Sequence, residues 1–313
     1  MSDPAFWAGK TVVVTGGAGF IGTAVVRCLT TRCGVPLSAI RIPRSASEDL
    51  RQWANAERVM AGADVVLHLA AVTGGSALSR EEPARQYRDS TLIDLNVVEA
   101  ARLAGVAKVV ALGNLFAYAE DAVSPLDECT IFDGLPGDSH RGAGWMKRNL
   151  ALLADLYARQ YQFPLAVVFT ANAYGPHDSL DRRLAHVIPA TILKCLLDPE
   201  LVVWGDGSPV RDFLYVDDIA AAMVLGAERL PPGAFANVGS GAGISVRELV
   251  TLIAEAAAFH GTVRFDTTKP KGDALRLASV TRGEALLGFR PEVGMREGMQ
   301  RTVAWYRGEL ARR

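Results

Sequence analysis

The sequence predicts an α/β protein with a doubly wound parallel sheet and a smaller C-terminal α/β lobe. Short β-branched strands alternate with amphipathic helical segments over the first 173 residues, which is typical of a parallel sheet. A glycine-rich turn joins the first strand to the first helix, and after residue 174 the elements become shorter and are broken by Gly and Pro. We therefore expect a core domain over 1–173 and a second lobe mainly over 174–313, with some segments returning to the core domain.

Hydrophobic periodicity places the individual elements. The expected strands of the parallel sheet are residues 10–15, 38–42, 64–69, 108–112 and 165–170. Helical periodicity covers residues 21–29, 83–104, 145–160, 217–228, 245–258 and 297–308. Ser245 and Glu248 have the spacing of a capping box, so they predict a helix that begins after Ser245.

Charge and cysteine content exclude several function classes. The chain has 33 Lys and Arg against 34 Asp and Glu in 313 residues, so no net field attracts nucleic acid or anionic lipid. The four cysteines form no C-x-x-C pair and have no nearby metal-ligand partners, so we expect reduced thiols and no metal site. Without a basic, apolar leader or an apolar run of about 20 residues, we expect a cytoplasmic protein with no membrane contact.

The turn after the first strand carries the strongest functional signal. Gly16, Gly19 and Gly22 form a G-x-x-G-x-x-G pattern, and Phe20 and Ile21 open the helix that follows. Glycines here allow a sharp turn, close approach of a pyrophosphate to backbone N–H groups, and tight packing of helix on strand. The phosphates then meet the positive end of the helix. This context predicts a Rossmann-type domain that binds a nicotinamide dinucleotide.

The residues after the second strand bear on the choice of cofactor. An acidic residue there favours NAD, but the sequence has Arg41 and Arg44, and a guanidinium can hold a 2′-phosphate. NADP is therefore favoured, while NAD is the alternative if both arginines are solvated and Asp49 meets the adenine side. Leu69, Ala70 and Ala71, which end the third strand, are expected to line the cofactor. His68 precedes them in an apolar strand and is interpreted as a core histidine.

Four sequence blocks carry a family resemblance. The glycine loop, HLAA at 68–71, NAYGP at 172–176 and RDFLYVDD at 211–218 resemble the extended short-chain dehydrogenase/reductase family of nucleotide-sugar epimerases, dehydratases and reductases. The resemblance runs from about residue 10 to residue 306. Blocks at 186–190, 202–209 and 265–270 are similar to the GDP-L-fucose synthases of that family, which act on a GDP-4-keto-6-deoxy sugar. The family resemblance implies a nucleotide-sugar substrate, and the similarity to the fucose synthases implies that this substrate is GDP-linked.

The resemblance also exposes departures in the catalytic residues. Lys147 fits the family's lysine, which binds ribose hydroxyls and lowers the pKa of a tyrosine four residues earlier, but that position is Ala143. The family's Ser or Thr falls on Asn114, and the cysteine that fucose synthases use for epimerisation falls on Phe116. Only His186 remains of that acid/base pair. Ala143 is either a natural replacement or a substitution made to trap substrate, and Tyr118, Tyr174 and His140 are candidate substitutes.

The resemblance also indicates which residues would contact the substrate. The resemblance places Arg211 and Lys194 at the sugar-nucleotide diphosphate, Trp204 against the sugar or base, and Asn172 near the nicotinamide and the substrate. Arg211 could instead pair with a neighbouring aspartate, and Trp204 could belong to the core. Lys271 stands where the family often has Asp, which leaves the base or ribose contact open.

Three functions are consistent with these residues. The favoured hypothesis is an NADP(H)-dependent epimerase/reductase-like enzyme acting on a GDP-linked keto- or deoxyhexose. The alternatives are a catalytically degenerate nucleotide-sugar or dinucleotide-binding protein, and a non-redox epimerase or lyase that uses His186. Family members often pair through two long helices, so segments 83–104 and 145–160 predict a homodimer.

Overall fold

A six-stranded parallel sheet forms the larger part of the molecule. The computed structural model describes residues 2–182, 186–269 and 275–313, except for the side chains of 75–77. The strand order is β2-β1-β3-β4-β5-β9, and every neighbouring pair is parallel. The strands are β1 (Val12–Thr15), β2 (Ile40–Arg41), β3 (Val65–His68), β4 (Lys108–Asn114), β5 (Leu165–Thr170) and β9 (Phe235–Val238). The predicted doubly wound Rossmann-type sheet is confirmed.

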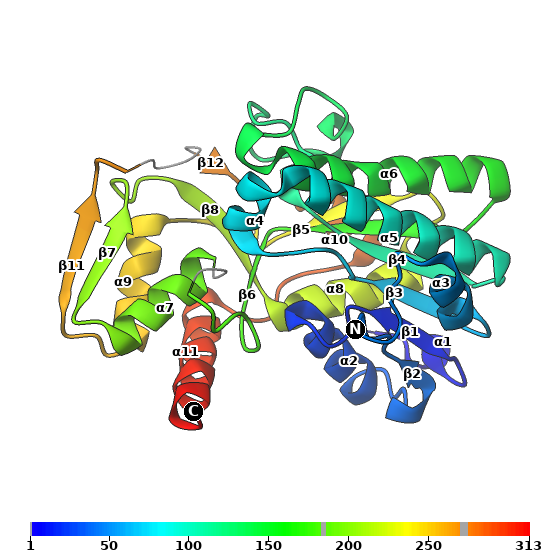
Figure 1. The fold of residues 1–313 in the computed structure, drawn as a ribbon, viewed down its shortest axis with the longest axis horizontal. Helices are drawn as coiled ribbons and strands as arrows, with labels where there is room; N and C mark the ends of the chain where they lie inside the picture. The colour runs from blue at the N-terminus through cyan, green and yellow to red at the C-terminus, as the bar shows by residue number, and fades with distance from the viewer. Residues whose placement is uncertain (1, 183–185, 270–274) are drawn as a thin grey trace.

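Helices cover both faces of this sheet (Figure 1). On one face α5 packs against α3 and α6, and on the other α8 packs against α2 and α10. Their bounds are α2 (Phe20–Thr31), α3 (Trp53–Met60), α5 (Pro83–Leu103), α6 (Arg141–Tyr161), α8 (Val216–Arg229) and α10 (Thr281–Leu287), with short α1 (Pro4–Trp7) and α4 (Gly75–Glu81) beside them. Since α8, β9 and α10 come from the C-terminal half of the chain, that half contributes to both parts of the molecule.

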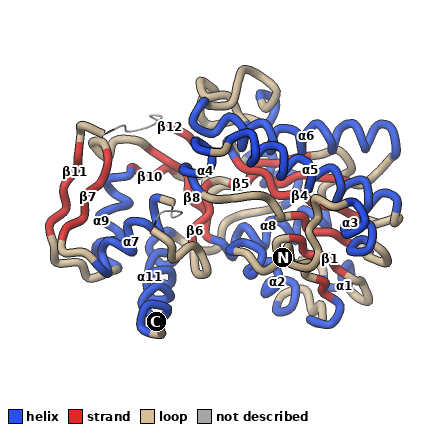
Figure 2. Tube along the Cα trace, viewed as in Figure 1, coloured by secondary structure: helices blue, strands red, loops and turns tan. Residues whose placement is uncertain are grey.

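A second lobe lies at the carboxyl end of the large sheet (Figure 2). Its central strand β8 pairs with β6, β10 and β12, and a separate parallel pair joins β7 to β11. Three helices pack around a hydrophobic core of its own. The elements are β6 (Asn172–Tyr174), α7 (Val187–Leu197), β7 (Glu200–Trp204), β8 (Val210–Tyr215), β10 (Gly243–Ser245), α9 (Val246–Ala256), β11 (Thr262–Asp266), β12 (Leu275–Arg276) and α11 (Met295–Ala311).

Local sequence signals set several boundaries correctly. Strand β5 spans the expected residues, and the capping box is present: Glu248 N donates to Ser245 Oγ at 3.1 Å and Ser245 N donates to Glu248 Oε2 at 2.9 Å. The strand expected over 38–42 is shorter, because residues 37–39 form a 3-10 turn. Helix α6 begins at Arg141, four residues before the expected start.

The core histidine predicted in β3 is confirmed. Thr15 Oγ1 lies 2.7 Å from His68 Nδ1, and His68 Nε2 lies 2.9 Å from Asp94 Oδ1, with all three side chains buried. The Thr15 hydroxyl accepts the N–H of Leu69 at 3.1 Å, so its own proton is directed to Nδ1. His68 therefore ties β1 and β3 to α5 and is occupied by structural hydrogen bonds.

A buried lysine joins the start of β4 to the end of α8. The Lys108 ammonium donates to the carbonyl of Leu230, which follows the last residue of α8. A cation at a helix C-terminus is favourable, but burial lowers the pKa of Lys108 to about 8. The charged form is therefore a net cost to the folded state.

We expect the free energy of unfolding of the wild type to rise, relative to Lys108→Met, between pH 8 and about pH 10.4. The folded-state pKa lies below the unfolded one, so the unfolded chain binds the proton more tightly and the penalty disappears as the pH rises through this window. The difference between the folded and unfolded pKa of Lys108 corresponds to at most about 3 kcal/mol in the free energy of unfolding. Urea unfolding at pH 7 and pH 10 measures it, with Lys269→Met as an exposed control. Parallel pH dependence in wild type and Lys108→Met would contradict the assignment.

Candidate active site

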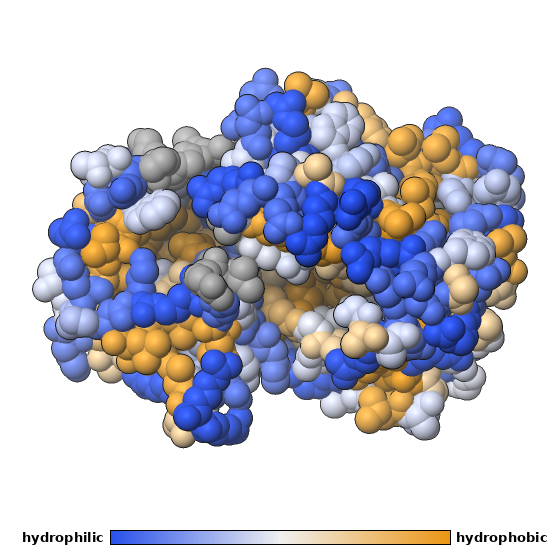
Figure 3. All heavy atoms as spheres, viewed as in Figure 1, coloured by the Kyte–Doolittle hydropathy of each residue, from blue (hydrophilic) through white to orange (hydrophobic). Residues whose placement is uncertain are grey.

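One large cavity lies between the two lobes, at the carboxyl ends of the parallel strands. Its volume is about 1180 Å³, and residues of both lobes line it. The space-filling view shows a hollow in this face with apolar side chains in its depth (Figure 3). Cavities for a single small ligand are typically about 300–1,000 Å³, so this one has room for two ligands side by side.

The glycine turn forms one end of the cavity. Gly16 has φ +69°, and a Cβ on Gly22 would lie 2.1 Å from the Gly16 carbonyl oxygen, so both positions require glycine. The contact brings α2 against the end of β1, with Gly19 as its N-cap and Phe20 and Ile21 as its first residues. Gly16, Gly19, Phe20, Ile21 and Gly22 all line the cavity. The N–H groups of a first helical turn are unpaired within the helix, and this arrangement fits a dinucleotide diphosphate.

The two predicted arginines have different surroundings. Arg44 lines the cavity, whereas Arg41 does not and donates to the carbonyls of Val59 and, at 2.9 Å, Ala61 at the end of α3. Asp49 also lines the cavity, but its carboxylate accepts hydrogen bonds from Arg51 at 2.7–3.1 Å. Arg41 is therefore held by the protein itself, and Arg44 is the arginine that the fold brings to the site.

The middle of the cavity contains Lys147. Its ammonium is buried and donates to the Leu112 carbonyl at 2.8 Å, and burial lowers the pKa of this group, opposed by the charge of Asp94. Ala143 lies one turn earlier on α6 and is 5% exposed, so the position where the family has tyrosine faces the cavity without a proton-carrying group. Leu69, Ala70 and Ala71 line the cavity as predicted.

An aromatic pair stands beside Ala143. The rings of Phe116 and His140 have centroids 4.2 Å apart, and both residues line the cavity. Asn114 also lines it, and its Oδ1 accepts the N–H of Phe116 at 3.1 Å, which caps the short turn after β4. The side chain of Asn114 is therefore engaged in fixing the position of Phe116.

The wall opposite belongs to the second lobe and is cationic. Arg211 on β8 and Arg276 on β12 are register partners in adjacent parallel strands, and both line the cavity. Arg276 was not predicted from the sequence; it is buried and donates to the carbonyls of Leu115, Tyr118 and Ala119 at 2.7, 3.2 and 3.2 Å, so it ties β12 to the turn after β4. Asn172 lines the same region, and its Nδ2 donates to the Asp212 carbonyl at 2.9 Å.

The aspartates near Arg211 have other partners. Asp212 accepts the N–H and the hydroxyl of Ser240 at 2.9 and 2.6 Å, and Asp218 accepts the N–H of Glu292 at 2.9 Å. Burial raises the pKa of both carboxyls. Asp212 therefore ties β8 to the loop after β9, and Asp218 ties α8 to the segment before α11.

His186 stands at the start of α7 and is exposed to the cavity. Asp178, which was not predicted from the sequence as a site residue, lines the same cavity. Burial raises the pKa of the Asp178 carboxyl, while its hydrogen bond from Ser179 N and the charge of His186 lower it. The site thus contains an imidazole and a carboxyl close enough to interact electrostatically.

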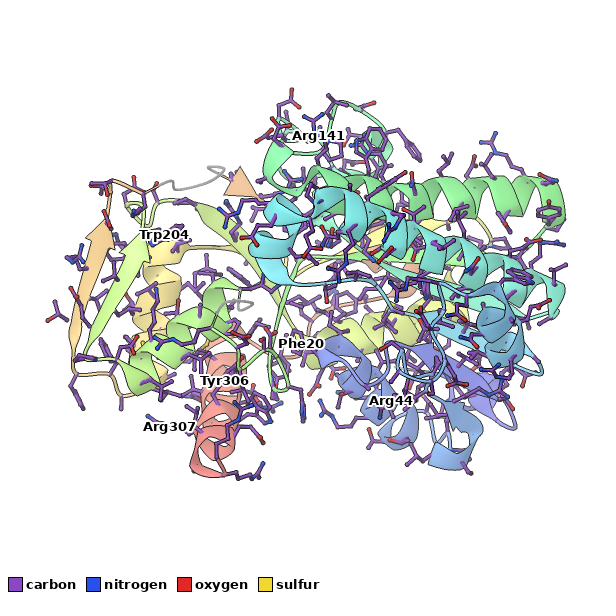
Figure 4. All side chains as sticks on the ribbon, in the orientation of Figure 1. Phe20, Arg44, Arg141, Trp204, Tyr306 and Arg307 are labelled. Carbon is purple, nitrogen blue, oxygen red and sulfur yellow. The ribbon has the colours of Figure 1, made fainter. Side chains whose placement is uncertain are left out.

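Two predicted substrate residues lie outside the residues that line the cavity. Lys194 donates to the Val202 carbonyl at 2.8 Å, and burial lowers its pKa. Trp204 is 59% exposed on β7, so it is not a core residue, with the Lys269 ammonium 5.9 Å from its ring centroid (Figure 4). Their roles at the substrate remain predictions. Lys271 lies outside the described residues.

The three candidate substitutes for the missing tyrosine differ in whether they reach the cavity. Tyr118 and Tyr174 are buried, and neither lines the cavity; the Tyr118 hydroxyl donates to Asn237 Oδ1 at 2.8 Å. Burial raises the pKa of both phenols. His140 is the only one of the three that the fold brings to the cavity.

Comparison with known proteins agrees with this geometry. The model of the NAD dependent epimerase/dehydratase family matches residues 12–239. The chain belongs to this family. It is 31% identical to a GDP-L-fucose synthase of Escherichia coli over 95% of this chain and 96% of that protein.

Two further relatives extend the comparison. A dTDP-4-dehydro-6-deoxy-D-allose reductase of Streptomyces is 28% identical over 96% of this chain and 97% of that protein. A GDP-L-fucose synthetase from Naegleria fowleri bound to NADP has the same fold, with a TM-score of 0.88 at 22% identity over 97% of this chain and 94% of that one.

The described part of the chain contains neither a membrane-spanning helix nor a cluster of metal ligands. No helix there combines the length and apolar character needed to cross a lipid bilayer. Within the same residues, no three His, Cys, Asp or Glu side chains are grouped as metal ligands would be.

Proposed function

We propose that the protein is an NADP(H)-dependent epimerase/reductase acting on a GDP-linked keto- or deoxyhexose. The observation that carries this proposal is the continuity of the cavity, which has the glycine turn at one end and the Arg211–Arg276 wall in the other lobe. A helix N-terminus and a guanidinium group such as that of Arg211 are both suited to diphosphates, so two diphosphate ligands can share the cavity. Relatives named for GDP- and dTDP-linked sugars support the substrate class.

The residues between these ends indicate how the chemistry is arranged. The cofactor would be held by Gly16–Gly22, Leu69–Ala71 and Lys147, and when bound it supplies or accepts a hydride. Asn172 and Arg211 would hold the sugar nucleotide opposite, with Arg276 behind them. Lys147 orients the ribose through a buried ammonium, and His186 moves a proton to or from the sugar.

The replaced residues define the second candidate. Ala143 and Phe116 cannot exchange protons, and Asn114 is a poor proton relay, so a binding protein without turnover is the alternative that these three positions favour. A non-redox epimerase or lyase that uses His186 is the third, since His186 requires no hydride to act on an acidic C–H group.

Incubation with NADPH and GDP-4-keto-6-deoxymannose separates these functions. We expect NADPH oxidation with a new GDP-sugar product, and at least a 100-fold fall in kcat/KM in Lys147→Met or His186→Ala. Lys10→Met, far from the cavity, serves as the control, and Ala143→Tyr tests whether the family's phenol raises the rate. Binding without turnover in every variant supports the binding protein, and a product without NADPH loss supports the non-redox enzyme; either result contradicts the proposed function.

The cofactor preference is a separate expectation. Arg44 would contact the 2′-phosphate of NADP, because Arg41 is tied to α3 and Asp49 is paired with Arg51. Arg44→Ala should raise the Kd for NADP about 10- to 100-fold, because a charge-assisted hydrogen bond is lost. The Kd for NAD should be unchanged. Titration calorimetry with both dinucleotides measures it. Arg41→Ala is the matched control and should preserve the NADP/NAD ratio; a ratio altered only by Arg41→Ala would contradict the assignment.

Helices α5 and α6 support a homodimer. They pack side by side on one face of the molecule (Figure 1). Both helices leave large apolar side chains exposed. These are Tyr87, Leu92, Leu95 and Leu103 on α5 and Trp145, Leu152, Leu156 and Tyr161 on α6. A contiguous apolar surface on two adjacent helices is suited to burial against a second copy by two-fold symmetry.

Light scattering tests the assembly. We expect twice the chain mass of 33.4 kDa at micromolar concentration, and the monomer mass for the double variant Leu95→Arg/Leu152→Arg. Leu37→Arg changes a more exposed leucine elsewhere and should leave the dimer intact. A wild-type monomer would refute the proposal.

A further inference from the structure

Asp178, on the wall of the cavity, has one carboxylate oxygen without a hydrogen-bond partner among the described residues. Asp178 Oδ1 accepts the N–H of Ser179 at 2.7 Å, but Oδ2 is shielded from water and has no hydrogen-bond partner in the described part of the chain. Leaving a buried, charged acceptor unsatisfied costs more than leaving a neutral one, so such a group in a native fold requires an explanation. The carboxyl borders the cavity that His186 enters.

The turn that carries Asp178 is held by the C-terminal helix. His177 has φ +72°, in the left-handed region, and its ring lies against Trp305 with centroids 5.2 Å apart. The Tyr306 hydroxyl donates to the Ser179 carbonyl at 2.9 Å, and Tyr306 is fully buried on α11 (Figure 4). Backbone strain that is held in place by packing concentrates at functional sites, which makes this turn a candidate for one.

The charged surroundings of Asp178 single out one partner. Among described residues, Tyr306 from α11 and His186 from the start of α7 interact with it electrostatically. Burial, and then Asp178, raise the pKa of the Tyr306 phenol, so that phenol stays neutral. His186 is therefore the group whose charge Asp178 can balance.

We propose that Asp178 is the carboxylate partner of His186: its Oδ2, which has no hydrogen-bond partner among the described residues, would accept from the imidazole when the sugar is bound, and its charge would stabilise the charge that the imidazole gains with a proton from the sugar. The inference rests on the proposed function. In that step one proton leaves a carbon next to the keto group, the C–H electron pair stays on the sugar as an enolate, and the imidazole becomes an imidazolium. Asp178 takes no proton. The arrangement gives His186 a carboxylate partner on a wall where Phe116 offers no ionisable group.

Carboxyl titration tests the pairing without any turnover. The ¹³C NMR signal of each carboxyl is followed in protein labelled with ¹³Cγ-aspartate. The signal of Asp178 is identified as the one lost in both Asp178→Asn and Asp178→Glu. We expect its titration midpoint to lie above the ordinary aspartate value of about 3.9 and to rise by roughly half a pH unit or more in His186→Gln, because a neighbouring positive charge is lost. An ordinary midpoint that His186→Gln leaves unchanged would overturn the proposal.

Kinetics test the role. Asp178→Asn should lower kcat about 10- to 100-fold with the KM for the sugar nucleotide unchanged, and should cause no further loss in a His186→Gln background, since residues that act as a unit are not additive. Asp198→Asn makes the same change at a surface ion pair with Arg182 and is the control. A lower melting temperature with additive losses would show a merely structural role and overturn the proposal. If wild type turns over no GDP-sugar, the proposed function fails while the carboxyl titration still decides the pairing.

Discussion

The close contact between Gly22 and the Gly16 carbonyl is the constraint on which the site depends. A side chain at Gly22 would lie 2.1 Å from that oxygen, so only glycine allows α2 to begin where β1 ends. This contact directs the first turn of α2 at the cavity and fixes where a diphosphate can lie. The second lobe presents Arg211 and Arg276 to the same cavity.

The polar groups of the cavity follow from that arrangement. Lys147 on α6 and His186 on α7 face the same space from different lobes, while the residues between them, Ala143 and Phe116, are apolar. Water has little to bind on this apolar surface, so charges at its edge interact more strongly than they would in solvent. A site that lacks the usual phenol therefore relies on its remaining ionisable groups and on what positions them.

Local signals in the sequence were sufficient for five of the six strands of the large sheet, apart from their exact ends, and for the glycine turn. Strand β5 and the Ser245–Glu248 capping box depend on neighbouring residues alone, and His68 could be placed in the core because its strand is apolar on both sides. Other assignments depend on contacts far apart in the chain. From the sequence, Arg41 and Arg44 were equally good candidates for the 2′-phosphate. The structure separates them, because Arg41 donates to carbonyls at the end of α3. Asp178 lies between two recognised blocks, 172–176 and 186–190, and the turn that carries it is held by a hydrogen bond from α11, over 100 residues later.

A crystal structure with NADPH and GDP bound together tests the central claim most directly. The account predicts the NADPH diphosphate against the backbone N–H groups of Gly19–Ile21, and the GDP diphosphate in the same cavity beside Arg211 and Arg276. A dinucleotide bound away from the glycine turn, or GDP bound outside this cavity, would contradict it.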